Sequence, residues 1–188
     1  KVGEMASKPA RSLSHRLLAL DDLKTGLSDA FNRLKRKGDG EPEKLFLESA
    51  EKDKRICIYV VSDEKKTIRG MATLAVEPKY IHECSAVGHI LNIWARDKEY
   101  LGSVIDYIVP KIVKAAKDMG CYKCLIDSDA QHVNLYEKVF FKKKDLQMAI
   151  SLTEDHCKKT DMPSPLLARK LQKTDYSKDF IGLLSQLT

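Results

Sequence analysis

A run of apolar residues spaced three and four positions apart constrains the fold of this chain more than any other feature. The run comprises Leu101, Val104, Ile105, Ile108, Val109, Ile112, Val113 and Ala116. This spacing puts all of them on one face of an α-helix, and that face must lie on a hydrophobic layer. Pro110 lies inside the run and lacks the amide that would bond to Asp106, so we expect a kink costing ~3 kcal/mol unless packing offsets it. The pattern predicts a long helix that ends at Gly120.

Segments rich in β-branched residues lie on both sides of this helix. Residues 56–61 and 68–77, separated by the polar stretch 62–66, predict a hairpin of two strands. A third strand is expected at 88–95, before the helix, and a short buried strand at 121–127, directly after it. A helix between two strands implies a parallel pair with a right-handed crossover. The sheet is therefore predicted to be mixed.

Weaker patterns complete the order of elements. They predict helices at 21–34 and 41–51, a short helix at 131–139 and a closing strand at 146–152. The resulting order, ααβββαβαβ, is typical of an α/β (α+β) domain.

Composition excludes several classes of protein. The chain has 188 residues, of which 43% are hydrophobic, and it contains no run near the ~18 apolar residues of a membrane span. Its net charge of +6 is too small to indicate a nucleic-acid partner. The five cysteines form a sparse, odd set, so we expect reduced thiols, and the basic, polar start predicts a cytoplasmic protein.

An internal repeat accounts for the length beyond one domain. Residues 168–188 align without a gap to residues 15–35, so that Arg16 meets Arg169 and Asp22 meets Asp175. We interpret the C-terminal segment as the first helix of a truncated second copy. The predicted organisation is a flexible basic lead-in at 1–14, a domain at 15–157, a linker at 158–167 and the truncated copy at 168–188.

Three short motifs resemble those of one enzyme family. KYIHEC at 79–84, CYK at 121–123 and NLYEK at 134–138 resemble the eukaryotic glucosamine 6-phosphate N-acetyltransferases. The resemblance implies the GNAT acyl-CoA N-acyltransferase fold, with helices on both faces of a mixed sheet. It also implies acetyl transfer from acetyl-CoA to the amine of glucosamine 6-phosphate, toward UDP-N-acetylglucosamine, by a homodimer without a metal.

The resemblance assigns residues to the acetyl donor. It implies that the backbone at Ile93 and Trp94 holds the pantetheine and that Tyr136 protonates the leaving thiolate. The family's pyrophosphate loop, Arg-Gly-Lys-Gln-Leu-Gly, is replaced by residues 100–105, in which Tyr100, Gly102 and Ser103 are the remaining candidates for donor binding. We expect Leu101 and Ile105 to project where the family brings phosphate oxygens. His132 stands in place of the family's donor-binding asparagine.

The acceptor side departs further from the family. Leu91 and Asn92 occupy the positions of the family's Glu-Asp pair, so Asn92 could accept a hydrogen bond but could not hold a proton. Lys35 replaces the substrate-loop threonine, and Lys79 is a further candidate for substrate binding. Ser151 and Leu152 replace the arginines that resemble the phosphate clamp.

Several residues also have a purely structural interpretation. Tyr136 could equally be a core residue, and His132 is more typical of a helix cap or a surface residue than of a base. Cys121 and Cys124 form a lone CxxC that His156 and Cys157 could complete as a zinc site, but buried strand thiols are the preferred interpretation. The lysines at 142–144 could attract a CoA phosphate, although a solvated strand end is the more common fate of such a run.

Two functional hypotheses follow. The first, which the number of substitutions favours, is that this copy is impaired or inactive and acts as a dimerisation or scaffold partner, either in a homodimer or paired with a second copy. The alternative is an active acetyl-CoA-dependent N-acetyltransferase with altered binding of its donor or its small-molecule substrate.

Overall fold

The computed structural model describes residues 13–19, 22, 48, 50, 52–80, 82–144, 148–149, 169–178 and 182. The chain divides into two compact units, residues 1–142 and 143–188. Each unit is described by itself.

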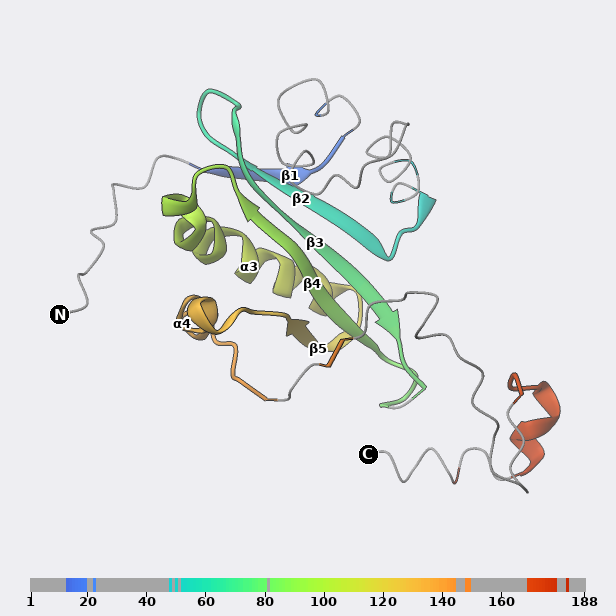
Figure 1. Ribbon diagram of the computed structural model, residues 1–188. Coiled ribbons are helices and arrows are strands. Elements are labelled where there is room, and N and C mark those ends of the chain that lie inside the picture. The colour runs from blue at the N-terminus through green and yellow to red at the C-terminus, as the bar shows by residue number, and fades with distance from the viewer. Residues whose placement is uncertain are drawn as a thin grey trace, which may run out of the picture. The chain divides into compact units, whose positions relative to one another are not determined.

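The first unit is built on a twisted sheet of five strands whose spatial order equals their order in the chain (Figure 1). The strands are β1 (Ser14–Leu17), β2 (Ile56–Ser62), β3 (Ile68–Pro78), β4 (Ala86–Ala95) and β5 (Cys121–Ile126). Neighbouring strands from β1 to β4 are antiparallel, whereas β4 and β5 are parallel. The predicted mixed sheet and its parallel pair are confirmed.

Helix α3 (Leu101–Asp118) follows a 3₁₀ turn, η2 (Lys98–Tyr100), and lies along one face of the sheet (Figure 1). The predicted stripe is the face that α3 turns toward the strands, because its members Val104, Ile108 and Ile112 are fully or almost fully buried. They pack with Val61, Ala72, Leu74 and Ile90 in the larger core cluster, which we call the α3-side core. Pro110 lies inside α3 with its side chain exposed.

A second, smaller cluster covers the opposite face of the sheet, and we call it the far-side core. Its buried members are Ala50, Ile58, Val60, Ile68 and Met71. Ala50 belongs to a short described helical stretch, so helical residues contribute to both faces. The helix predicted at 21–34 lies outside the described residues, apart from Asp22, and so does most of the one at 41–51.

The structure differs from the sequence-based expectations at two strands, and a third predicted strand falls mostly outside the described residues. β1 was not predicted, because its four residues are all exposed and show no apolar alternation. β5 was expected to be buried, and this is wrong, because it borders the described sheet and its residues Tyr122, Lys123 and Leu125 are exposed. Its other residues, Cys121, Cys124 and Ile126, pack on the α3-side core. The strand predicted at 146–152 lies outside the described residues except for Met148 and Ala149, which are in neither helix nor strand.

An arginine–aspartate clasp fixes the turn after β1. Arg16 donates to Asp22 through Nη1 at 2.6 Å and through Nη2 at 2.5 Å. The backbone amide of Ala19 donates to the same carboxylate at 2.9 Å, and Arg16 Nη1 also reaches the carbonyl of Leu17 at 3.2 Å. We call this network the first clasp. It closes a tight turn around a carboxylate that is almost entirely buried.

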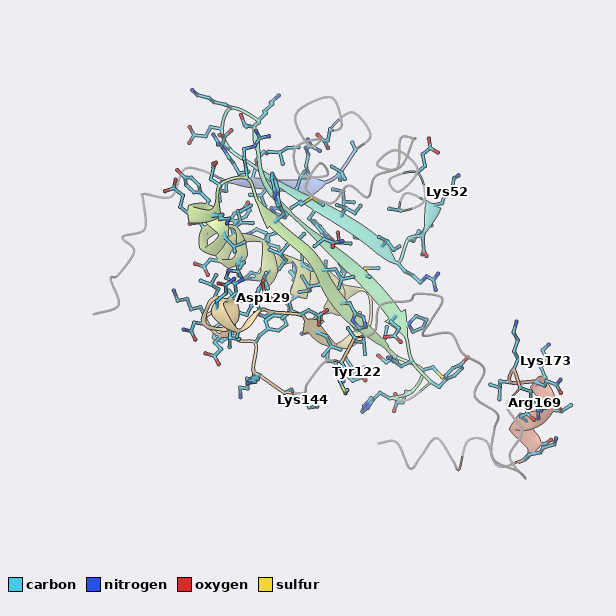
Figure 2. The ribbon with its side chains drawn as sticks, in the orientation of Figure 1. Lys52, Tyr122, Asp129, Lys144, Arg169 and Lys173 are labelled. Atoms are coloured by element: carbon cyan, nitrogen blue, oxygen red, sulfur yellow. The ribbon has the colours of Figure 1, made fainter. Side chains whose placement is uncertain are left out.

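The second unit contains the same network 153 residues later, the offset from Arg16 to Arg169. Arg169 donates to Asp175 at 2.8 and 2.6 Å, the amide of Gln172 donates to that carboxylate at 2.8 Å, and Arg169 also reaches the carbonyl of Lys170 at 3.0 Å. A 3₁₀ helix, η5 (Lys173–Lys178), follows, and Figure 2 labels Arg169 and Lys173 in this segment. We call this network the second clasp. The aligned residues of the sequence repeat thus make the same contacts.

Candidate active site

A β-bulge interrupts β4 at the first candidate residue. Thr73 faces Leu91 and Met71 faces Trp94, so Ala72 alone stands opposite both Asn92 and Ile93. Asn92 is exposed and adopts the left-handed conformation, with φ of 52°, which asparagine tolerates better than most residues. The bulge leaves one residue of β4 without a partner on β3. Asn92, Ile93 and Trp94 are therefore brought together at a local distortion of the strand.

The other edge of β4 is open beside this bulge. β5 pairs with β4 only from Ala86 to Ile90, so no described strand pairs with the β5-facing edge of residues 91–95. Backbone amides and carbonyls along that edge can bond to an extended ligand in the way that an added strand would. This arrangement fits the predicted backbone contacts of Ile93 and Trp94 with an amide-containing chain.

The amino end of α3 has no side-chain cap, although the amides of Tyr100 and Leu101 already donate to the carbonyls of Asp97 and Lys98. Tyr100 is its N-cap residue and makes no side-chain cap hydrogen bond, and the first turn contains no acidic residue. Ser103 is exposed, and a Cβ placed on Gly102 would lie 3.6 Å from Leu135 Cδ2, so the first turn of α3 adjoins α4 (Val133–Glu137). The positive end of the helix dipole, with no acidic residue in the first turn, still favours an anion such as a pyrophosphate here.

Ile105 does not project toward this amino end, contrary to the expectation from the sequence. Its side chain is 0% exposed and belongs to the α3-side core, because Ile105 is itself a member of the apolar stripe. Leu101 is partly buried against the same core. The predicted obstruction of phosphate oxygens by Ile105 is therefore wrong.

Tyr136 lies on α4 and is 8% exposed. Burial raises the pKa of its hydroxyl, and the negative charge of Asp129 raises it further. The side chain is part of the α3-side core, so the packing interpretation is confirmed, while its chemical role stays a prediction. With a raised pKa, Tyr136 keeps its proton at neutral pH, as a proton donor must.

His132 is the N-cap residue of α4 but does not cap it through its side chain, because it makes no such hydrogen bond. Its Nδ1 lies 3.9 Å from Asp129 Oδ2, and Figure 2 labels Asp129 beside this end of the helix. His132 thus occupies the predicted cap position, but its side chain does not make the capping bond. A role in donor binding stays a prediction.

Lys79 lies at the other end of β4 from the bulge. It follows β3, and the register pairs the preceding Pro78 with Ala86, so six residues of strand, or ~20 Å, separate this end from Asn92. Lys79 Nζ pairs with Glu77 Oε1 at 2.5 Å, and His89 Nε2 lies 2.8 Å from Glu77 Oε2. The hydrogen bond from Lys79 and, to a smaller extent, the one from His89 lower the pKa of Glu77. Within one chain, Lys79 is not part of the group around Asn92.

The remaining candidates either lie outside the described residues or are described by themselves. Lys35, Ser151, Leu152, His156 and Cys157 lie outside the described residues. The four described cysteines are unpaired, and burial raises the pKa of Cys121 and Cys124. Among the described residues, no group of three or more His, Cys, Asp or Glu residues is placed to hold a metal ion. The lysines at 142–144 are exposed, and Figure 2 labels Lys144.

Comparisons with known proteins agree on one family. No protein-family model matches the chain. The glucosamine 6-phosphate N-acetyltransferase of Candida albicans is 33% identical over 90 residues, which are 48% of this chain and 60% of that protein. Glucosamine 6-phosphate N-acetyltransferase 1 of Dictyostelium discoideum is 29% identical over 152 residues, which are 79% of this chain and 96% of that protein. The chain is a homologue of the eukaryotic glucosamine 6-phosphate N-acetyltransferases.

Solved acetyltransferase structures share the fold of this chain. An acetyltransferase of Trypanosoma brucei matches with a TM-score of 0.64 and 26% identity, covering 75% of this chain and all of that one. An acetyltransferase of Clostridium acetobutylicum, solved with acetyl-CoA, shares the fold with a TM-score of 0.59 at 15% identity, covering 74% of this chain and 96% of that one. The homologue therefore has the GNAT fold. Among its described residues, no helix is both long and apolar enough to cross a membrane.

Sequence reasoning missed two side chains near the bulge of this homologue. Thr73 Oγ1 and Trp94 Nε1 are buried and have no hydrogen-bond partner, and they are the only such side-chain atoms among the described residues. Trp94 was predicted to contribute through its backbone alone. The signal that could have pointed to it is a tryptophan within a strand of small and β-branched residues.

Proposed function

We propose that this chain binds acetyl-CoA and transfers its acetyl group to the primary amine of glucosamine 6-phosphate or a closely related amino sugar. The observation that carries the proposal is the β4 bulge beside an open strand edge, in a homologue of enzymes named for this reaction. The amino end of α3 supports it, because its amides are uncapped by side chains and Ile105 does not obstruct them.

We assign donor binding and proton transfer to the following residues. The open edge at Ile93 and Trp94 holds the amide-containing arm of the donor, and the first turn of α3 binds its pyrophosphate. Acetyl-CoA supplies the thioester. The amine nitrogen forms the new bond to the acetyl carbon, the carbon–sulfur bond breaks, and neutral Tyr136 gives its proton to the departing sulfur.

Asn92 cannot act as the general base of this reaction. Its side-chain carbonyl can accept a hydrogen bond from the amine and orient it, but it cannot remove a proton. The amine must therefore attack in its neutral form, its nitrogen releases one proton to water as the amide forms, and Tyr136 regains a proton from water. We expect turnover that rises with pH until the amine of the acceptor is mostly unprotonated, because Asn92 itself does not titrate.

Isothermal titration with acetyl-CoA tests the donor site. We expect saturable binding that Ser103→Glu weakens about tenfold, or ~1.4 kcal/mol, because a carboxylate in the first turn of α3 repels the pyrophosphate while still favouring the helix. Lys117→Glu, an exposed charge reversal near the carboxyl end of the same helix, is the control and leaves the affinity within twofold. Binding that is absent, or equally affected by both variants, would contradict the proposed site.

A noncatalytic partner is the second candidate function. It is favoured by the lack of any carboxylate at positions 91 and 92 and by the recurrence of the clasp contacts in the second unit. In this form the domain pairs in a homodimer or with a second copy of the GNAT domain. Saturable acetyl-CoA binding without product, together with a stable dimer in sedimentation, would favour it over the enzyme.

A further inference from the structure

Two buried polar atoms without partners flank the bulge of β4. Thr73 is 3% exposed, and neither its Oγ1 nor Trp94 Nε1 makes a hydrogen bond in the described structure. Burying a hydroxyl or an indole N–H without a partner costs free energy, so such groups in a folded protein need an explanation. A core role does not explain them, because valine and phenylalanine would fill similar volumes without the cost.

Both side chains are on the same face of the sheet. Met71 and Trp94 face each other in the register and both belong to the far-side core. Thr73 is two residues from Met71 along β3 and therefore shares its face, whereas the intervening Ala72 packs in the α3-side core. The two unpartnered atoms thus lie on the face opposite α3, one on each side of the bulge.

We assign the second ligand to the far side of the sheet. The donor elements, namely the amino end of α3 and the open edge, are tied to the α3 side through Leu101 and Ile93, which pack on the α3-side core. An acceptor that attacks the thioester must approach from a different direction than the donor. The far side of the bulge satisfies this requirement and carries polar atoms that lack partners.

We propose that Trp94 Nε1 and Thr73 Oγ1 are contacts for hydroxyl groups of the acceptor. The indole N–H can only donate and would bind a hydroxyl oxygen, whereas the threonine hydroxyl can donate or accept. The ligand class is therefore a polyhydroxylated amine, such as an amino sugar, and a simple alkylamine would leave both atoms unpartnered. This inference rests on the proposed function and adds to it two residues that select the acceptor.

Trp94 is the only tryptophan of the chain, so it reports directly on its own environment. With glucosamine 6-phosphate as the probe, we expect a saturable shift of tryptophan emission to longer wavelength as Nε1 gains a partner. Cyclohexylamine, which carries the amine without hydroxyls, should produce no shift. An equal response to both amines, or no response to either, would overturn the inference.

Variants separate this role from a structural one. Thr73→Val should raise the KM for the amino sugar about tenfold, leave the affinity for acetyl-CoA unchanged, and leave the melting temperature unchanged or slightly higher. Trp94→Phe should raise the same KM about tenfold. Tyr59→Phe, which removes a hydroxyl packed on the α3 side, is the control and should change none of these. A lowered melting temperature with an unchanged KM would show that Thr73 and Trp94 serve only the fold.

Failure of this inference is distinguishable from failure of the proposed function. Turnover by the wild type with unaltered KM in both variants would overturn the inference and leave the enzyme in place. A selective emission shift without any turnover would overturn the proposed enzyme and support the sugar contacts.

Discussion

The clasp between Arg16 and Asp22 makes a quantitative prediction. Asp22→Asn keeps the size of the side chain but removes its charge, and it turns one hydrogen-bond acceptor into a donor that faces the guanidinium of Arg16. The wild-type carboxylate accepts two bonds from Arg16, at 2.6 and 2.5 Å, and one from the amide of Ala19 at 2.9 Å. Because Arg16 Nη1 and the amide of Ala19 both donate to Oδ2, an asparagine oxygen at that place retains these two bonds without the charge and loses the bond from Arg16 Nη2 to Oδ1.

The expected loss follows from the exposure of the two partners. Two charge-assisted bonds would contribute about 3 kcal/mol or more if both groups were buried. The side chain of Asp22 is 6% exposed but that of Arg16 is 50% exposed, so solvent screening reduces the loss to about 2 kcal/mol. For a unit of this size, that is a fall in melting temperature of roughly 4 to 8 °C.

The assay is thermal unfolding followed by circular dichroism at neutral pH, with Asp53→Asn as the control. Asp53 also pairs with an arginine, Arg55, at 2.8 Å, but the arginine is largely exposed, so this variant should melt close to the wild type. A fall of less than 1 °C for Asp22→Asn, or an equal fall in both variants, would refute the reasoning.

The pH dependence of stability has the same origin. The hydrogen bonds from Arg16 lower the pKa of Asp22, so the stabilisation is present above the pKa of an unfolded aspartate and disappears as pH falls through the lower folded value. The gap in stability between wild type and Asp22→Asn should therefore close on acidification below about pH 4. A gap that persists unchanged at pH 2 would contradict this linkage.

Grafting tests whether the two clasps are equivalent. Replacing residues 16–22 (RLLALDD) by residues 169–175 (RKLQKTD) keeps the arginine, the aspartate and the leucine between them. We expect the graft to melt within about 2 °C of the wild type, far above Asp22→Asn. If the graft melts as low as Asp22→Asn, the interpretation of residues 168–188 as the start of a second copy loses its support.

Three further variants address packing and chemistry. Gly70→Ala should destabilise the fold by about 1 to 3 kcal/mol in chemical denaturation, because its Cβ would lie 2.7 Å from Val104 Cγ1 and 2.8 Å from the carbonyl oxygen of Trp94. Tyr136→Phe should lower kcat about 10²-fold at unchanged acetyl-CoA affinity if the hydroxyl protonates the thiolate; an unchanged kcat would leave Tyr136 as a core residue only. Asn92→Asp should raise kcat about 10²-fold by restoring a base that the left-handed backbone tolerates, and no gain would remove Asn92 from the chemistry.

Periodicity predicted the central elements because each repeats its apolar residues over several turns or pleats. The stripe beginning at Leu101 became α3, and alternation at 56–61 and 68–77 became β2 and β3. β1 was not predicted, because an exposed edge strand of four residues shows no apolar alternation. The element order was sufficient to predict the parallel pair of β4 and β5.

The site was harder to predict because it depends on register. Nothing in the run 86–95 shows that Ala72 will face two residues of β4, so the left-handed backbone of Asn92 emerges only when β3 and β4 pair. The burial of Ile105, in contrast, could be predicted from its place in the apolar stripe. Comparison with the family loop alone led to the wrong expectation. The unpartnered atoms of Thr73 and Trp94 likewise depend on packing that no local pattern encodes.

The most direct test of the central claim is chromatographic detection of N-acetylated product from acetyl-CoA and glucosamine 6-phosphate. The account predicts equimolar formation of CoA and N-acetylglucosamine 6-phosphate at a rate proportional to protein concentration, reduced by Tyr136→Phe and raised by Asn92→Asp. Product formation no faster than in a protein-free mixture, from a folded wild-type chain at saturating acetyl-CoA, would contradict it.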